Sequence, residues 1–300
     1  MDDLMGVLLQ LEPRLGTATA GPSPLEGGIT NRNYRVRFGS RDCVVRLPGK
    51  DTALLGISRE AEQLAGRAAA RLGIGPEVLA AAGDYVVTEY VAGEPMDPAA
   101  LRASPEPVAA ALRLFHDAGI ELPVRFWVPD LLESYARIVA ERGGTLPNEY
   151  AEASRVVRRI ATALPLREPV ACHDDLLPAN VLRVDAGHGV MLVDWEYAGM
   201  GHRLFDLGNL AVNAELEEPE ELALLAAYYG EEASPGRRAA LALMRIMSDA
   251  REAAWGVVQG VVSELDFDFQ GYAARHFDRL ARAVSGGRFE LWLSEAAALA

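Results

Sequence analysis

Residues 172–182 read CHDDLLPANVL and place a histidine, two aspartates, a proline and an asparagine between two short apolar runs. The preceding PVAC (169–172) is typical of the end of a buried strand, and VLRV (181–184) of the start of another. We therefore expect residues 173–180 to form a loop held by two rigid elements. Such loops commonly position functional side chains.

Polar side chains in and after this loop share a chemical use. His173, Asp175 and Asn180 follow the pattern His-x-Asp-x-x-x-x-Asn, and a further apolar strand, VMLVDW (190–195), delivers Asp194 near its end. Mg²⁺ prefers oxygen ligands and takes only one or two from the protein when phosphates complete its shell, so Asn180 and Asp194 are the predicted metal ligands. Asp175 is then the predicted base that accepts a proton from a substrate hydroxyl. The set indicates phosphoryl transfer.

Two assignments within the loop have alternatives. Asp174 competes with Asp175 as the base, and only one of these neighbours can face the metal ions; the spacing to Asn180 favours Asp175. His173, a member of the catalytic set, is expected to support the loop rather than to react. A loop whose Asp and Asn side chains merely cap turns is the structural alternative.

Phosphoryl transfer requires a nucleotide site, which we place in the N-terminal half. EGGITNRNY (26–34) is a glycine-led turn whose backbone N–H groups could contact phosphates. The following strand, RDCVVRLPG (41–49), carries Arg46, whose planar guanidinium can bind phosphate oxygens bidentately. The predicted nucleotide contacts in the turn are Gly27, Gly28, Thr30, Asn31 and Asn33.

Two further segments complete the expected nucleotide site. A helix predicted over 58–72, with Ser58 as its N-cap, offers Glu60 or Glu62 as the partner of Arg46. The strand end VVTEYVAG (86–93) is the expected place for adenine to meet backbone groups, between Glu89 and Val91.

The order of predicted elements divides the chain into two parts. Residues 1–91 alternate strands with two helices, whereas helical patterning dominates from 109 onward, except for strands within 169–194. GEPMDPAALRASPEPV (93–108) contains four prolines and is predicted to be a connector. We expect an α+β chain with a small β-rich N-terminal lobe, residues 1–91, and a larger, mostly helical lobe, residues 92–300.

Composition limits the partners. The formal net charge of -14 argues against a nucleic-acid or anionic-membrane surface, because both need a basic patch, and it suits a small cationic substrate. The chain has two distant cysteines, and its N-terminus, MDDLMGVLLQ, has no basic leader region. A cytoplasmic protein is therefore expected. The oligomeric state cannot be predicted from the sequence.

These motifs resemble those of the choline/ethanolamine kinases, in particular their bacterial branch within the aminoglycoside phosphotransferase-like group. The resemblance extends over about residues 25–275 and is carried by GGITNRNY (27–34), VVRLPGK (44–50), TEYVAGEPM (88–96), HDDLLPAN (173–180), LVDWEYAGMGHRLFDLGNL (192–210) and WGVVQ (255–259). It implies a protein-kinase-like two-lobe fold, with ATP and Mg²⁺ as cofactors.

The resemblance also implies residue roles. Asp175 would be the base, Asn180 and Asp194 the metal ligands, and Arg46 a phosphate contact. Glu62, beside Arg59, fits the family pattern better than Glu60. Asp206 in FDLGNL (205–210) would brace the catalytic loop.

The acceptor side implied by the resemblance combines aromatic faces with carboxylates, an arrangement that suits a substituted ammonium ion. Tyr197 and Trp255 fall at matching positions, and Glu196 flanks Tyr197, although neighbours on a strand end cannot all face one pocket. Asn213 stands where the family has a pocket carboxylate, with Glu215 two residues later, and this departure bears on choline as the substrate.

The predicted function is a kinase that phosphorylates choline, ethanolamine or a similar amino-alcohol. An aminoglycoside or thiamine phosphotransferase of the same fold is the alternative, followed by a non-catalytic nucleotide-binding pseudokinase. A protein kinase is disfavoured, because about a dozen residues separate Asp194 from Asp206 and leave no room for an activation segment.

Overall fold

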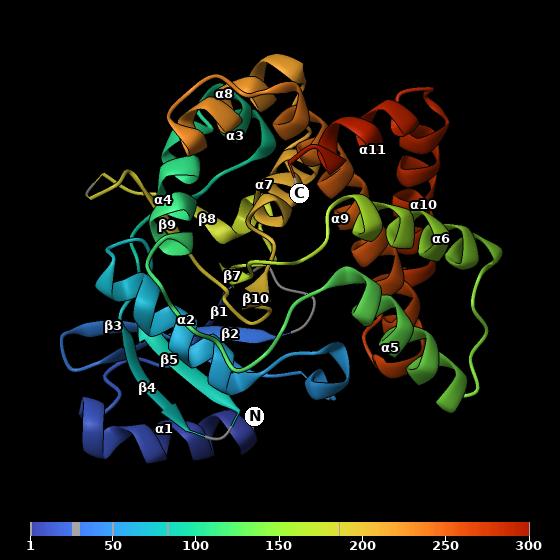
Figure 1. Cartoon of the computed structure of the whole chain (residues 1–300). Coiled ribbons are helices and arrows are strands. Elements are labelled where there is room, and N and C mark those ends of the chain that lie inside the picture. The colour runs from blue at the N-terminus through green and yellow to red at the C-terminus, as the bar shows by residue number, and fades with distance from the viewer. Residues whose placement is uncertain (1, 26–30, 50, 83, 186, 300) are drawn as a thin grey trace.

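The computed structural model describes the chain except for residues 1, 26–30, 50, 83, 186 and 300. Its N-terminal part is a five-stranded antiparallel sheet with the order β1-β2-β3-β5-β4. The strands are β1 (Ser23–Leu25), β2 (Arg32–Phe38), β3 (Arg41–Leu47), β4 (Val78–Ala82) and β5 (Tyr85–Glu89). Figure 1 shows α1 (Asp2–Leu15) on one side of this sheet and α2 (Arg59–Arg71) on the other.

Side chains along β3 alternate between the two faces of the sheet, one toward α1 and the other toward α2. Cys43, Val45 and Leu47 are buried on the α1 side, where they pack with Leu8 and Leu11 of that helix. Because successive side chains of a strand point to opposite faces, Arg46 lies on the other side, toward α2. The sheet thus has a small apolar core of its own and presents Arg46 on its opposite face.

The helix α2 begins as the sequence predicts. The hydroxyl of Ser58 accepts a hydrogen bond from the backbone N–H of Ala61 at 3.3 Å and so caps its first turn. A stripe of small side chains, including Ala61, Ala65 and Ala68, packs into the larger core of the helical part. By its packing, α2 therefore joins the two parts of the chain.

The C-terminal part is built around α9 (Pro235–Val262), which packs against most of the other helices there. Figure 1 shows α9 among these helices. They are α3 (Pro98–Ala103), α4 (Glu106–His116), α5 (Val128–Glu141), α6 (Asn148–Ala163), α7 (Arg203–Asn213), α8 (Glu218–Tyr229), α10 (Phe269–Ser285) and α11 (Phe289–Ala297).

Two small sheets hold the central loops of this part. β7 (Val170–Cys172) pairs with β10 (Gly199–Gly201), and β8 (Val181–Arg183) pairs with both β6 (Glu94–Pro95) and β9 (Val190–Leu192). The loop 173–180 therefore leaves one sheet and enters the other. The strands expected within 169–194 are confirmed, whereas the pairing of β7 with β10 is not evident from the sequence.

The connector predicted over 93–108 is wrong in detail, because most of it is regular structure. It contains β6, α3 and the start of α4. Its prolines are compatible with helices: Pro98 stands in the first turn of α3 behind Asp97, whose Oδ1 accepts a hydrogen bond from the N–H of Ala100 at 2.7 Å. A proline in a first helical turn loses no intrahelical bond. The boundary between residues 91 and 92 stays a prediction.

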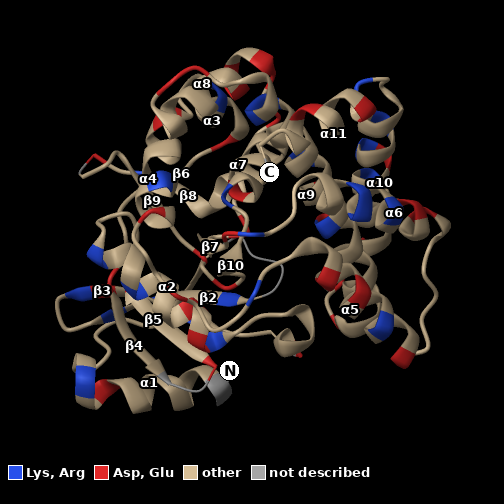
Figure 2. Cartoon of the chain, viewed as in Figure 1, with Lys and Arg blue, Asp and Glu red and all other residues tan. Residues whose placement is uncertain are grey.

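Acidic and basic residues are found along the whole described chain. Figure 2 shows acidic and basic residues interspersed over both parts of the chain rather than gathered into a basic stripe. Among the described residues, no helix is long and apolar enough to cross a membrane. The chain thus has a small β-rich lobe and a larger helical lobe, as the sequence predicts.

Candidate active site

A cavity of about 550 Å³ lies between the sheet of the N-terminal lobe and the central loops of the helical lobe. Asp175, Asn180 and Asp194 all line it, so the loop after β7 and the segment after β9 meet there. The backbone N–H of Val193 donates to the carbonyl of Asn180 at 3.0 Å and holds these two segments side by side.

Asp206 at the start of α7 fixes the loop from behind. Its carboxylate accepts hydrogen bonds from the backbone N–H groups of His173 and Asp174, each at 2.8 Å, and from the ring of His116 at 3.0 Å. The side-chain oxygen of Asn209, one turn further along α7, accepts the N–H of Leu176. The loop conformation is thus set by two polar side chains of one helix, in agreement with the bracing role that the resemblance implies for Asp206.

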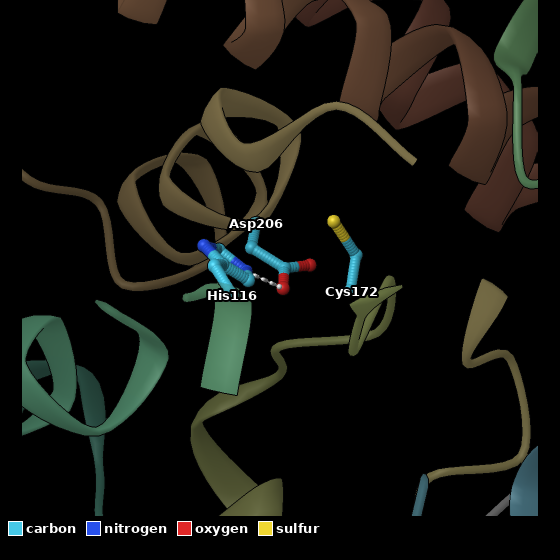
Figure 3. A group of neighbouring side chains, drawn as sticks. All are labelled: His116, Cys172 and Asp206. Atoms are coloured by element: carbon cyan, nitrogen blue, oxygen red, sulfur yellow. Dashed lines mark hydrogen bonds and ion pairs between the residues drawn. The ribbon is translucent and has the colours of Figure 1, made fainter. Parts of the chain in front are cut away.

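His116, Cys172 and Asp206 form a buried group that has metal-ligand chemistry but is already occupied by hydrogen bonds (Figure 3). Both oxygens of Asp206 accept backbone N–H groups, and the other ring nitrogen of His116 lies 2.7 Å from the hydroxyl of Tyr228. Burial raises the pKa of the Cys172 thiol well above its ordinary value, which keeps it neutral. The group therefore stabilises the loop.

The neighbouring aspartates of the loop face different surroundings. Asp174 has a left-handed backbone with a φ of 64°, and its carboxyl group is buried beside Gly201, outside the cavity lining. Asp175 faces the cavity, and its Oδ1 accepts a hydrogen bond from Nη1 of Arg251 at 3.1 Å. Burial raises the pKa of Asp175, and the positive charge of Arg251 acts against that rise.

His173 does not reach the cavity. It is fully buried; one ring nitrogen lies 2.9 Å from the carbonyl of Val193, and the other accepts the N–H of Asp175 at 3.3 Å. Burial lowers the pKa of this imidazole. The contacts fit a residue that orients Asp175.

The predicted metal ligands present suitable oxygens. Nδ2 of Asn180 donates to the carbonyl of Asp175 at 2.8 Å, which turns the amide oxygen away from that carbonyl. Asp194 uses one carboxylate oxygen to pair with Arg46, and the other accepts no hydrogen bond from a described residue. An amide oxygen and a carboxylate oxygen on one cavity wall fit Mg²⁺.

Arg46 joins three elements. Its guanidinium pairs with Glu62 of α2 and with Asp194, and Arg59 also donates to Glu62 at 2.7 Å. Glu60 is exposed. Of the two carboxylates left open by the sequence, Glu62 is therefore the partner of Arg46.

Most of the residues predicted to contact the nucleotide line the cavity. Asn33, Arg46, Glu62, Glu89 and Val91 line the cavity, together with apolar side chains from both lobes. The backbone N–H of Val91 makes no hydrogen bond with another described residue, so it can donate to a ligand.

The glycine-led turn is only partly described. Asn31 also lines the cavity, and its Nδ2 donates to Glu196 at 2.7 Å, so it ties the turn to the segment after Asp194. The predicted contacts Gly27, Gly28 and Thr30 lie outside the described residues.

The acceptor side differs from the sequence-based expectation in two respects. Trp195, Glu196 and Tyr197 all line the cavity, because they form an irregular turn rather than a strand end. The turn begins at Asp194, whose backbone is left-handed with a φ of 63°. Alternation between faces therefore does not apply to these residues.

Asn213 is not part of the cavity lining, and neither is Glu215. The α7 helix directs Asp206 and Asn209 toward the loop, and with a rise of about 1.5 Å per residue Asn213 lies about 10 Å beyond Asp206 along the axis. Its predicted place in the acceptor site is wrong for that reason.

Three polar or charged side chains of the cavity lining were not predicted from the sequence. Arg251, Glu252 and Tyr272 line the cavity, and Trp255, which was predicted, lies one turn beyond Arg251 on α9. The signal was present, because DARE (249–252) interrupts a long apolar stretch and buried charges in such a stretch need partners.

Fold and site together define a phosphotransferase with a protein-kinase-like architecture, and comparisons with known proteins agree. Residues 22–243 match the model of the phosphotransferase enzyme family, so the chain belongs to that family. Within it, the chain belongs with the choline/ethanolamine kinase family: a crystal structure of such a protein from Mesorhizobium loti is 31% identical, covers 98% of this chain and 99% of its own, and has a TM-score of 0.83.

Two further relatives extend the comparison. The choline kinase LicA from Streptococcus pneumoniae has the same fold, with 21% identity, a TM-score of 0.81, and coverage of 95% of this chain and 100% of its own. A probable ethanolamine kinase from Arabidopsis thaliana is 29% identical over 211 residues, which are 62% of this chain and 54% of that protein. The match therefore spans about half of the plant protein.

Proposed function

We propose that the protein transfers the γ-phosphate of ATP to the hydroxyl group of a small amino-alcohol such as ethanolamine or choline. The observation that carries this proposal is the position of Asp175. It lies in one cavity with Asn180 and Asp194 as well as with the ionic and aromatic side chains of α9.

Each part of the chain has a role in the proposed reaction. The apolar walls and the free N–H of Val91 would hold adenine, and Arg46 would contact phosphate oxygens. Mg²⁺ held by Asn180 and Asp194 would neutralise charge on the phosphates. Asp175 would orient the acceptor hydroxyl and accept its proton as the new O–P bond forms and ADP leaves.

The lining of the cavity favours a cationic acceptor, because the carboxyl groups of Asp175, Glu196 and Glu252 lie among its walls. Both cysteines are buried and unpaired, which suits a reducing compartment such as the cytoplasm.

A substrate panel tests the proposal. Purified protein is incubated with ATP, Mg²⁺ and either ethanolamine, choline, thiamine or kanamycin; ADP release is measured, and the phosphorylated product is identified by ³¹P NMR. We expect ADP release that depends on ethanolamine or choline. Turnover of kanamycin or thiamine alone would move the protein to the alternative substrate classes, and turnover of none would favour a pseudokinase.

A further inference from the structure

Arg251 places a buried positive charge on the acceptor side of the cavity. Its side chain is 2% exposed, and Nη1 donates both to Asp175 at 3.1 Å and to Glu252 at 2.5 Å. The guanidinium thus joins the proposed base to the one carboxylate that α9 contributes to the cavity.

The same guanidinium covers the aromatic ring expected to receive the substrate. Its central carbon lies 4.2 Å from the centroid of the Tyr197 ring, and Tyr197 is only 6% exposed. The hydroxyl of Tyr197 accepts a hydrogen bond from Nε1 of Trp255 at 2.9 Å, which fixes both rings. One face of the Tyr197 ring is therefore covered by the guanidinium of Arg251.

This arrangement affects two kinds of ammonium ion differently. A quaternary ammonium has no N–H and depends on open aromatic faces. A primary ammonium has three N–H donors and is satisfied by oxygen acceptors. Glu252 can supply these oxygens: it lines the cavity and accepts one bond from Arg251 and one from the hydroxyl of Tyr272 at 2.6 Å, which leaves further lone pairs.

Charge balance points the same way. Burial alone would raise the pKa of Glu252, but the charge of Arg251 and further contacts outweigh it, so the pKa is lowered and the carboxylate stays ionised. Glu252 therefore offers a negative charge to a substrate cation in this cavity. Moving Arg251 off Tyr197 to admit a quaternary ion would break its bonds to both carboxylates.

We propose that Arg251 is a specificity-determining residue that makes this pocket select alcohols bearing a primary ammonium, such as ethanolamine, over quaternary ones such as choline. The proposal rests on the proposed function, because it concerns the acceptor of that reaction.

The ratio of kcat/KM for ethanolamine to kcat/KM for choline measures the selection. Both acceptors use the same base and nucleotide, so damage to Asp175 or to ATP binding cancels in the ratio. We expect wild type to favour ethanolamine at least about tenfold, and Arg251→Met, which keeps the length but not the charge, to lower the ratio at least about tenfold. Arg245→Met is the matched control, because Arg245 lies on the same helix, pairs with Glu221 and does not line the cavity. Its ratio should equal that of wild type.

A second measurement on the wild-type protein is independent of the variant and of turnover. Thermal unfolding with ATP and Mg²⁺ is followed with methylammonium or tetramethylammonium added at equal concentration. We expect methylammonium to raise Tm more. A preference for tetramethylammonium or choline, or an unchanged ratio in Arg251→Met, would overturn the role of Arg251 while leaving the kinase function intact. Absence of turnover with either alcohol would instead count against the proposed function, and the ammonium ions would still decide the pocket's preference.

Discussion

Asp174 and Asp175 are adjacent, yet their carboxyl groups lie in different surroundings: that of Asp175 lines the cavity, and that of Asp174 is buried outside it. Asp175 meets Arg251 at the cavity, whereas neither oxygen of Asp174 accepts a hydrogen bond from a described side chain. Burial raises the pKa of Asp174 well above its ordinary value of 3.8, and the nearby charge of Asp206 adds to the rise. Burial therefore favours the protonated form of Asp174, while the loop holds this residue in a left-handed conformation.

The raised pKa of Asp174 makes the stability of the protein depend on pH. Between the unfolded and the raised folded pKa, the native state binds more protons than the unfolded state, so the contribution of Asp174 is complete below about pH 4 and is lost as pH rises. Asp174→Asn removes this titration. We expect the Tm of the variant to match wild type near pH 4 and to exceed it at pH 8 by about 2–4 °C. Scanning calorimetry at both pH values checks this, and a constant Tm difference would contradict it.

Single residues also mark where sequence reasoning failed. The motif spacing predicted that Asp175, Asn180 and Asp194 share one site. This prediction was possible because short segments between neighbouring strands keep these residues close together. The left-handed turn at Asp194 could not be read from residue types, and it brings Trp195 to Tyr197 into the cavity together. Arg251 was missed because one of its partners, Asp175, lies 76 residues away in the sequence, although the charges in DARE (249–252) were a signal.

At the scale of elements, the site depends on the contact between α7 and α9. The former carries Asp206, which braces the catalytic loop, and the latter carries Arg251. Gly208 lets the helices approach: a Cβ atom there would lie 2.7 Å from the backbone carbon of Met244. Ridge-and-groove packing cannot accommodate such an overlap without moving a helix.

Gly208→Ala should therefore lower the free energy of unfolding by about 1–3 kcal/mol, despite the better helix propensity of alanine. Gly6→Ala is the matched control, because Gly6 lies in α1 and a Cβ atom there would meet nothing within 4 Å. It should be neutral or stabilise by up to about 1 kcal/mol. Urea unfolding measures both, and equal effects would refute the role of this contact.

Elements were predicted well where local signals decide them. Ser58 caps α2 as expected, and the alternation of β3 gives its buried face. Pro98 and Pro105 were interpreted as part of a connector, but they stand at the starts of α3 and α4. Proline is common both in first helical turns and in loops, so its presence alone does not distinguish them. Which of these applies depends on packing that lies outside the segment.

At the scale of the whole molecule, Arg46 connects the lobes. Its side chain is 11% exposed and reaches from β3 to Glu62 and to Asp194. We expect Arg46→Met to raise the Kd for ATP with Mg²⁺ by about tenfold to a hundredfold, because a charge-assisted hydrogen bond contributes about 1.5–3 kcal/mol. Isothermal titration calorimetry gives the Kd directly.

Arg37→Met is the control for that change. Arg37 lies on the adjacent strand and pairs with Asp42 at the surface, with 52% of its side chain exposed. Exposed pairs contribute little, so the Kd should stay within about twofold of wild type. An equal rise of the Kd in both variants would contradict a direct contact between Arg46 and the nucleotide. It would mean that only the net charge of the protein affects binding.

The most direct measurement compares kcat for Asp175→Asn and Asp174→Asn with ethanolamine, ATP and Mg²⁺, alongside nucleotide binding by calorimetry. Of these two aspartates, only Asp175 lines the cavity. We therefore expect Asp175→Asn to lose about 10²–10⁴-fold in kcat while still binding nucleotide. Asp174→Asn should keep kcat within a few-fold of wild type. Greater loss in Asp174→Asn, or near-normal kcat in Asp175→Asn, would contradict the assignment of Asp175 as the base.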